Sequence, residues 1–167
     1  MSAQNIQPIA QFENLRVEFE TRDGTVVGVE DVSFHINPGE TVCVVGETGS
    51  GKSVSSLSMM RLVEFGGGSI AGGKLIFDRA KSGPINVANA DQSLMRSIRG
   101  NEIGMIFQEP MNALNPVKKI GVQLSEVFLL HQKLDREEAW ESSIEMLDKV
   151  GIPSPETRVL EYPHQLS

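Results

Sequence analysis

The sequence has few of the features by which disulfides stabilise secreted proteins or apolar segments anchor membrane proteins. Among its 167 residues there is a single cysteine, so no disulfide can form within the chain. We expect this thiol, Cys43, to be buried in an apolar strand, in keeping with a reducing compartment. The N-terminus lacks the basic and apolar blocks of a signal peptide. No apolar run is long enough to cross a bilayer, so a membrane role would have to act through a partner.

Positive charge and aromatic side chains are also scarce. Fifteen lysines and arginines stand against 22 aspartates and glutamates, which gives a net charge of −7. This balance provides no global attraction to nucleic acid or to anionic lipid. Aromatic residues make up 5% of the chain, yet 40% of it is hydrophobic, which is typical of a globular domain with a sizeable core.

A glycine-rich loop is the most informative feature that the chain does have. The loop fits the pattern G-x-x-x-x-G-K-[ST], follows the apolar run Thr41–Val45 and precedes a predicted helix over Val54–Val63. Its residues are Gly46, Glu47, Thr48, Gly49, Ser50, Gly51, Lys52 and Ser53. A strand, a loop and a helix in this order are the context in which the motif wraps nucleotide phosphates.

The residue types of this phosphate loop suit a triphosphate with its magnesium ion. Its glycines lack a Cβ, so the backbone can curl and bring N–H groups close to phosphate oxygens. Lys52 is a point charge that can reach the β and γ phosphates, and the Ser53 hydroxyl is suited to Mg²⁺. The loop by itself leaves a kinase, a GTPase and a transport ATPase open.

The first half of the chain is predicted to be rich in strands. Apolar and polar residues alternate over Phe12–Glu20, and Asp23–Gly24 is a tight turn that predicts a hairpin. The glycine-rich stretch 66–73 is interpreted as a flexible surface loop. Further strands are expected at Thr25–Val29, Val32–Ile36, Thr41–Val45, Lys74–Asp78 and Ile103–Phe107.

The second half is predicted to be mostly helical, after one short helix over Asp91–Arg99 that Asp91 caps. Apolar residues at helical spacing indicate helices over 120–130 and 135–150. Asp135 with Glu138 three residues later forms a start like a capping box. A last short helix is expected to begin at Ser154-Pro155, with proline in its first turn.

Two further motifs narrow the class of protein. Phe107–Pro110 leaves a predicted strand directly into a loop, where the Gln108 side chain can bind Mg²⁺ through its carbonyl and orient water through its amide. Tyr162–Ser167 closes the chain on Leu-Ser. With the phosphate loop, these residues resemble the ATP-binding subunits of ABC transporters, in which a Q-loop glutamine, a helical subdomain and a signature beginning Leu-Ser follow in this order.

The resemblance runs from about Phe12 to Ser167 and extends to a branch of the family. The stretches 107–116, 146–153 and 162–167 are similar to the ATPases of oligopeptide, dipeptide, nickel and glutathione importers. Among these, glutathione-importer ATPases are the most similar subgroup. The phosphate loop differs from the commoner form of the branch mainly at Thr48, where serine is usual.

The resemblance implies an α/β fold. It would comprise a P-loop NTPase (RecA-like) core with an N-terminal antiparallel β hairpin and a helical subdomain, truncated before the Walker B strand. The expected parts are a flexible tail over 1–11, the hairpin and core part over 12–110, and the helical subdomain over 111–167. The Walker B carboxylates and the switch histidine would follow Ser167, so no catalytic residue is assigned. We expect such a truncated chain to fold poorly alone.

The resemblance also implies a function and a set of ligands. The complete protein would bind ATP and Mg²⁺ and energise the import of peptides or a similar small solute such as glutathione. The phosphate loop would hold ATP, and Ser53 with Gln108 would hold the metal. Phe19 stands where tyrosine is frequent and would stack on adenine, although a purely structural place in the core stays open.

The implied partners are integral-membrane permease subunits, a second ATP-binding subunit, identical or paralogous, and indirectly an external solute-binding protein. Residues around 111–116 would lie near the groove for the permease, at the cytoplasmic face of the inner membrane, and no nucleic acid is expected. The alternatives are a truncated module that binds nucleotide without hydrolysis and a soluble ABC ATPase of another class. A small-molecule kinase is disfavoured by the Leu166-Ser167 ending.

Overall fold

The computed structural model describes residues 7–80, 82–109 and 113–166. It contains two compact units, Met1–Arg99 and Gly100–Ser167. The division predicted at 11 and 110 stays a prediction. In the described part of the chain, no helix combines the length and the apolar character needed to cross a bilayer.

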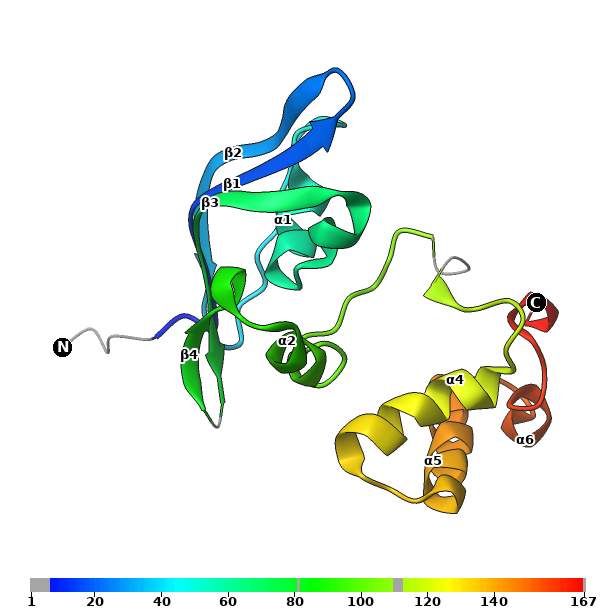
Figure 1. Cartoon of the computed structure of the whole chain (residues 1–167). Helices are drawn as coiled ribbons and strands as arrows, with labels where there is room; N and C mark the ends of the chain where they lie inside the picture. Colours follow the sequence, from blue (N-terminus) through cyan, green and yellow to red (C-terminus); the bar gives the residue numbers. More distant parts are fainter. Residues whose placement is uncertain (1–6, 81, 110–112, 167) are drawn as a thin grey trace. The chain divides into compact units, whose positions relative to one another are not determined.

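The first unit is built on a four-stranded antiparallel sheet with the strand order β2-β1-β3-β4 (Figure 1). The predicted hairpin is confirmed, because β1 and β2 pair directly on either side of the turn before Gly24. The β2 strand is continuous where the sequence pattern predicts two strands, at 25–29 and 32–36. The strands are β1 (Ala10–Thr21), β2 (Gly24–Ile36), β3 (Gly68–Arg79) and β4 (Gly83–Asn86).

Three residues with a left-handed backbone conformation, one from each of the three long strands, are neighbours in the sheet. Asn14 on β1 has φ 49°, Asp31 on β2 has φ 52°, and Gly73 on β3 has φ 84°. The Asn14 Nδ2 donates a 2.6 Å hydrogen bond to Asp31 Oδ1, and a Cβ on Gly73 would lie 2.4 Å from the Asn14 carbonyl oxygen. Strand pairing is irregular here, so burial shifts from even positions such as Phe12 to odd positions such as Leu15.

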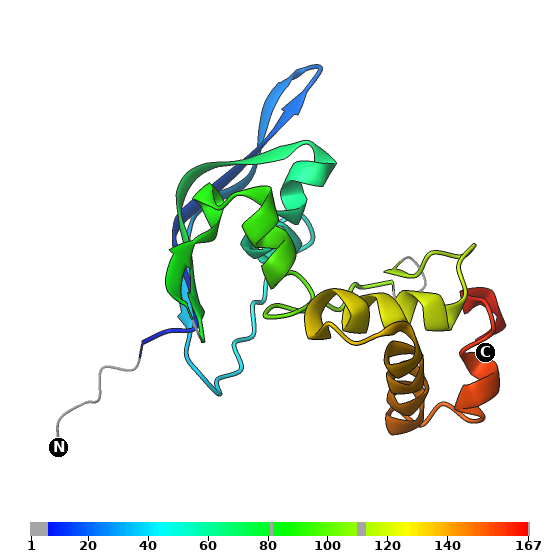
Figure 2. The same ribbon diagram turned by 60° about the horizontal axis from the view of Figure 1, so that its bottom comes forward.

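The helices of the first unit, α1 (Lys52–Met59) and α2 (Gln92–Ile98), lie on one side of the sheet (Figures 1 and 2). Short 3₁₀ turns, η1 (Leu62–Gly66) and η2 (Val87–Asn89), connect them to the strands. Asp91 caps α2 as predicted, because its Oδ1 accepts a 2.7 Å hydrogen bond from the Leu94 N–H. The best-buried apolar side chains of this unit are Leu15, Val17, Leu75, Val87, Met95 and Ile98.

The second unit is helical. It contains α4 (Ile120–Val127), a π-helical turn η3 (Phe128–Gln132), α5 (Arg136–Lys149), α6 (Pro155–Arg158) and a 3₁₀ turn η4 (Pro163–Gln165). Its core gathers Ile120, Leu147 and Val159, with Leu124, Trp140, Ile144, Ile152 and Leu166 packed against them. Burial of one such side chain contributes on the order of 2 kcal/mol, so this cluster holds the helices together.

Local sequence signals account for the ends of these helices. Asp135 and Glu138 form the predicted capping box at the start of α5. Gly151 follows α5 with φ 77°, a left-handed conformation that ends a helix readily. A Cβ on Gly121 would lie 2.4 Å from Val159 Cγ2 and 2.7 Å from the Trp140 ring, so glycine allows α4 to approach both side chains. The capping box is confirmed, and Pro155 lies in the first turn of α6 as predicted.

Two predicted strands are wrong. Residues 41–47 are irregular, and so are 104–107, with Ile103 in an isolated bridge. A strand exists only where its N–H and C=O groups pair with a neighbour, and no strand of the described sheet lies beside either segment. Apolar character alone did not bury them, since Val45 is 84% exposed and Ile106 is 94% exposed. Cys43 is exposed as well, which corrects the prediction of a buried thiol.

The other differences concern the extent of elements. The glycine-rich stretch 66–73 is not a flexible loop, because residues from Gly68 onward belong to β3 and pair with β1. Pairing with an ordered strand outweighs the intrinsic weakness of glycine in a sheet. The helix predicted over Val54–Val63 ends at Met59 and resumes as η1, and the helix predicted over 120–130 continues past Val127 as η3.

Candidate nucleotide-binding site

The phosphate loop is an exposed turn that runs into the first residue of α1. Gly49 and Gly51 adopt left-handed conformations with φ 87° and 86°, and the Ser50 N–H bonds the Glu47 carbonyl at 3.2 Å. A side chain disfavours this backbone, so glycine is needed at both positions. The whole of Gly46–Ser53 lies in the first unit, and the structure therefore brings the predicted phosphate-binding residues together.

The Lys52 ammonium group is held inside this loop. Its Nζ donates hydrogen bonds to the Gly46 carbonyl at 2.7 Å, to the Glu47 carbonyl at 2.5 Å and to Ser50 Oγ at 3.2 Å. An ammonium group has three donors, and these three oxygens match them in number. Phosphate oxygens carry more negative charge than any of the three, so an incoming triphosphate would be the better acceptor.

The start of α1 reinforces this positive site. Among the described residues no side chain caps the helix, and its first turn contains no acidic residue. Helix N-termini carry unpaired N–H groups and a partial positive charge, which favour an anion at this position. Lys52 therefore adds a full charge at a place where the backbone already favours an anion.

Ser53 is the candidate for the metal. It is the second residue of α1 and is exposed, so its hydroxyl oxygen is open to a hard cation such as Mg²⁺. No group of three histidine, cysteine, aspartate or glutamate side chains in the described part of the chain could hold a metal ion on its own. The residues predicted to hold the ion, Ser53 and Gln108, stay a prediction.

Gln108 belongs to the second unit and is exposed at a bend. Together with Phe107, Glu109 and Ala113 it lines a shallow hollow. Gln108 and the phosphate loop belong to different units, and their joint role at the metal stays a prediction. Of the stretch 111–116 predicted to face the permease, residues 111 and 112 lie outside the described part.

Sequence analysis missed the residue that holds the remainder of that stretch. Gln123 of α4 accepts a 2.7 Å hydrogen bond from the Asn115 N–H and donates bonds of 3.0 and 2.9 Å to the carbonyls of Asn115 and Lys118. A glutamine on a helix gives no sequence signal for such a contact with a preceding loop. The result is a loop, 115–118, that is fixed to α4 by one side chain.

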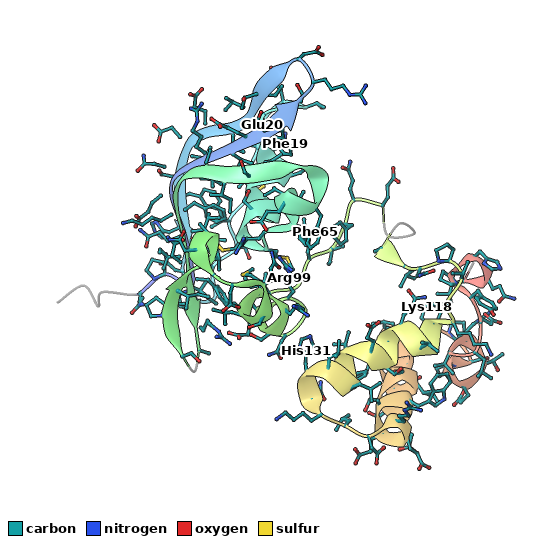
Figure 3. The ribbon with its side chains drawn as sticks, viewed as in Figure 1. Phe19, Glu20, Phe65, Arg99, Lys118 and His131 are labelled. Atoms are coloured by element: carbon teal, nitrogen blue, oxygen red, sulfur yellow. The ribbon has the colours of Figure 1, made fainter. Side chains whose placement is uncertain are left out.

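Phe19 has a packing role that is visible in the structure. Its half-buried ring lies over Gly28 of β2 and Gly68 of β3, where a Cβ would meet ring carbons at 2.6 and 2.7 Å (Figure 3). Val54 of α1 lies near the same spot, since its Cγ1 is 3.7 Å from the Cβ position of Gly28. The ring therefore fills a space that two glycines leave, and its stacking on adenine stays a prediction.

Gly28 also supports the phosphate loop, which the sequence did not reveal. A Cβ on Gly51 would lie 2.7 Å from the Gly28 carbonyl oxygen and 3.0 Å from Val29 Cγ2. The signal that could have found Gly28 is a glycine in the interior of a strand, which often marks a close approach of another backbone.

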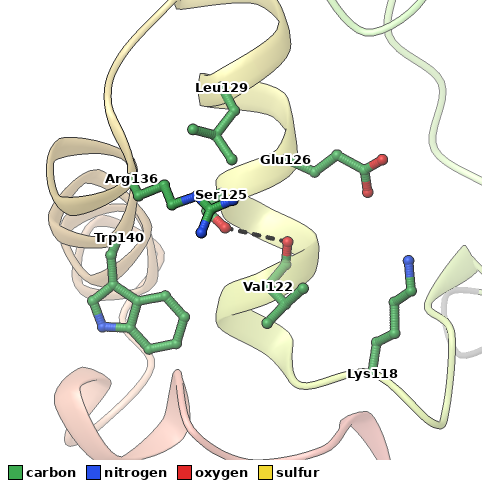
Figure 4. A pocket seen from close by; sticks show the side chains of 7 residues that line it. All are labelled: Lys118, Val122, Ser125, Glu126, Leu129, Arg136 and Trp140. Carbon is green, nitrogen blue, oxygen red and sulfur yellow. Dashed lines mark hydrogen bonds between the residues drawn. The ribbon is translucent and has the colours of Figure 1, made fainter.

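Another hollow lies on the helical unit, between α4 and α5 (Figure 4). Val122, Ser125 and Glu126 of α4 line it, together with Arg136 and Trp140 of α5. The Ser125 hydroxyl is bonded to the Val122 carbonyl at 3.2 Å. None of the residues predicted for the nucleotide site lines this hollow.

A comparison with protein families decides the relationship. The family model described as ABC transporter matches residues 29–167, which include the whole phosphate loop and Gln108. The chain belongs to the ABC transporter family. The predicted resemblance is confirmed, and the α/β fold class is confirmed by the structural neighbours described below.

The curated relatives of this ABC transporter chain are import proteins. It is 52% identical over 162 residues to a peptide import ATP-binding protein of Brucella abortus, covering 96% of this chain and 48% of that protein. It is 44% identical to the glutathione import ATP-binding protein of Pectobacterium atrosepticum, covering 95% and 26%, and 40% identical to the oligopeptide transport ATP-binding protein of Bacillus subtilis, covering 95% and 43%. The chain thus spans about half the length, or less, of these relatives.

Solved structures agree on the fold. A dimeric ATP-binding cassette in a post-hydrolysis state bound to ADP and Pi superimposes with a TM-score of 0.76 at 21% identity, over 95% of this chain and 63% of that chain. A bacterial Atm1-family ABC exporter with ATP bound gives a TM-score of 0.55 at 20% identity, over 99% and 26%. At these identities the likeness establishes the ABC cassette fold alone.

Proposed function

We propose that the chain forms the nucleotide-binding part of an ABC-type import ATPase that binds ATP with Mg²⁺. The observation that carries the proposal is the Lys52 ammonium group, held by three loop oxygens at the uncapped start of α1. The names of the relatives support the transport of peptides or a similar small solute such as glutathione. The peptide import relative shares a higher identity with the chain than the glutathione import relative, which favours peptides.

In this function the backbone of Gly49–Ser53 surrounds the phosphates and Lys52 neutralises their charge. The Ser53 hydroxyl and the Gln108 side-chain carbonyl bind the magnesium ion that accompanies ATP. The partners are permease subunits in the membrane, a second ATP-binding subunit and, through the permease, a solute-binding protein. The protein then acts at the cytoplasmic face of the inner membrane, and no nucleic acid takes part.

Nucleotide binding is tested on the protein expressed from its complete reading frame. We expect Lys52→Ala to weaken ATP binding by about 10- to 100-fold, because hydrogen bonds to a charged group contribute about 1.5–3 kcal/mol. Isothermal titration calorimetry with ATP and Mg²⁺ measures the change. Lys74→Ala is the matched control, since Lys74 is an exposed lysine of the same unit that pairs with Glu13 at 3.3 Å. Equal affinity of Lys52→Ala and wild type would contradict the proposal.

Turnover separates this function from the alternative of a module that binds nucleotide without hydrolysis. Steady-state release of phosphate that disappears in Lys52→Ala supports the ATPase. Tight binding of ATP with no release of phosphate by the protein in its membrane complex supports the module instead.

The proposed role of Phe19 has its own test. Replacement by leucine keeps an apolar filler over Gly28 and Gly68 but removes the aromatic face. We expect Phe19→Leu to weaken ATP binding severalfold and to leave the binding of inorganic tripolyphosphate unchanged. A parallel loss for both ligands would assign Phe19 to packing alone.

A further inference from the structure

Arg99 is placed where the first unit ends, and it is bonded to the far end of the phosphate-binding helix. It follows α2 directly as its C-terminal cap residue. Its Nε donates a 2.7 Å hydrogen bond to the carbonyl oxygen of Met60, 39 residues earlier in the chain. Met60 is the cap residue that ends α1, and α1 begins at Lys52. One helix therefore joins the phosphate loop at its start to Arg99 at its end.

The electrostatics of this contact are favourable at the helix end. The last carbonyls of a helix lack intrahelical partners and form the negative end of its dipole, which a guanidinium complements. The Arg99 guanidinium also lies over the Phe65 ring, with Cζ 5.5 Å from the ring centroid (Figure 3). Its Nη1 is 3.4 Å from Gln92 Oε1, at the start of α2.

Surrounding side chains extend the contact into a network. Glu64 of η1 accepts a 2.6 Å bond from Arg61 Nε and a 3.1 Å bond from Gln92 Nε2, and Arg61 also bonds the Ala90 carbonyl. Arg99 thus lies in a small frame that ties the end of α1, η1 and the start of α2 to one another.

One nitrogen of the Arg99 guanidinium lies in an unfavourable environment. Its Nη2 is buried and has no hydrogen-bond partner among the described residues. Burial lowers the pKa of Arg99, with Glu64 opposing the change and Arg61 and Arg96 adding to it. A buried donor without a partner is costly, so simple stability is a poor reason for this placement.

The chain after Arg99 suggests what the placement achieves. Gly100 turns in a left-handed conformation with φ 79°, and its N–H bonds the Ile103 carbonyl at 2.9 Å. The segment then runs without regular structure to Gln108. Arg99 is the anchored start of the segment that carries Gln108.

We propose that Arg99 is a positioning residue that fixes the segment leading to Gln108 to the C-terminal end of the phosphate-binding helix. The proposal rests on the proposed function, because it assigns Gln108 to the Mg²⁺ of bound ATP. Arg99 itself touches no nucleotide. It sets where the segment begins, at the end of the helix whose first residue is Lys52.

The test uses the protein from its complete reading frame, assembled with its membrane partners. We expect Arg99→Ala to lower kcat for ATP hydrolysis by about 10- to 100-fold, because small misplacements of a positioned group have effects of this size. The dissociation constant for ATP and the KM should change less than about threefold, since the phosphate loop stays intact. Arg99→Lys keeps the charge and one donor for the Met60 carbonyl, and it should recover part of kcat.

Arg96→Ala is the matched control. Arg96 lies on the same helix and is exposed, and its Nε is 3.4 Å from the Gln92 carbonyl. We expect its kcat to equal that of the wild type. If Arg99→Ala and Arg99→Lys melt at lower temperature but turn over at the wild-type rate below their melting points, the role is structural and the proposal is overturned.

Amide hydrogen exchange provides a second readout that does not need turnover. In the wild type, ATP with Mg²⁺ should slow exchange in the peptide covering 101–108, and Arg99→Lys should reduce this protection severalfold. Equal protection in both would overturn the proposal. A wild type that binds no ATP would instead refute the proposed function itself, so the two failures are distinguishable.

Discussion

The phosphate loop rests on the backbone of β2, because a Cβ on Gly51 would lie 2.7 Å from the carbonyl oxygen of Gly28. Gly51 is also the residue from which α1 starts, with φ 86°. Two requirements therefore meet at one glycine: a left-handed backbone and the absence of a side chain. The phosphate loop therefore packs against the hairpin formed by β1 and β2.

Substitution of Gly51 separates these two requirements. Gly49 has nearly the same φ of 87° but nothing within 4 Å of its Cβ position. We expect Gly49→Ala to lower the free energy of unfolding by about 1–2 kcal/mol from backbone strain alone. Gly51→Ala adds a clash with Gly28 and should cost about 3 kcal/mol or more. Urea titrations of both variants measure the difference, and equal losses would contradict the contact with β2.

The Phe19 ring makes a second prediction about glycine. Gly68→Ala places a methyl group 2.7 Å from the ring, and we expect a loss of about 1–3 kcal/mol in the free energy of unfolding. Gly72→Ala is the control on the same strand, where the nearest atom, the Arg16 Cβ, is 3.4 Å away. The double variant Phe19→Ala with Gly68→Ala should show a large coupling energy. Additive losses in this cycle would mean that the ring and Gly68 do not interact.

The capping box of α5 is open to a direct test. Asp135 accepts hydrogen bonds from the N–H groups of Glu137 and Glu138 at 2.9 and 3.0 Å. Asp135→Ala leaves these donors without the cap and should lower the free energy of unfolding by about 1 kcal/mol. Asp135→Asn keeps an acceptor oxygen and should retain most of that stability. Equal unfolding curves for alanine and wild type would show that water replaces the cap at no cost.

Asp91 predicts a dependence of stability on pH. The Leu94 N–H and then the Ser93 hydroxyl lower the pKa of Asp91 from its ordinary 3.8. A carboxylate with a lower pKa in the folded state stabilises the protein above its unfolded pKa, and this contribution is lost as pH falls through the folded pKa. We therefore expect the difference in unfolding free energy between wild type and Asp91→Asn to shrink below about pH 4. Urea titrations from pH 6 to pH 2.5 measure this difference.

Ser93→Ala supplies the control for that experiment. It removes the Ser93 hydroxyl, one of the hydrogen-bond donors that lower the pKa of Asp91, so the decline should move to higher pH. If the unfolding free energies of Asp91→Asn and the wild type differ by the same amount at every pH, the charge of Asp91 contributes nothing to the cap.

The features that the sequence predicted well are those set by neighbours along the chain. The caps at Asp91 and Asp135 and the turn before Gly24 each depend on a few consecutive residues, and all three are confirmed. The conformation of the loop Gly46–Ser53 is local in the same way, because its glycines and Lys52 lie within eight positions of one another, while its binding of phosphate stays a prediction. Such features follow from local geometry and require no knowledge of the fold.

The features that the sequence missed depend on distant partners. The apolar segments 41–45 and 103–107 have the composition of strands, but a strand needs a neighbour with which to pair. The opposite error occurred at Gly68–Gly73, where pairing with β1 makes a strand from residues that favour loops. The contacts of Gly28 with Gly51 and of Arg99 with Met60 join residues 23 and 39 positions apart, and neither leaves a pattern in the sequence.

The irregular pairing at Asn14, Asp31 and Gly73 decides which side chains of β1 are buried beyond this point. From Phe12 to Leu15 the β1 strand advances three residues while β2 advances two, from Phe34 to Val32, so β1 contains one extra residue here. If β1 alternated regularly through Asn14, Leu15 and Val17 would face water and Arg16 and Glu18 would face the core. A regular strand that buries the same side chains is therefore one residue shorter, and its alignment with β1 needs a gap at Asn14.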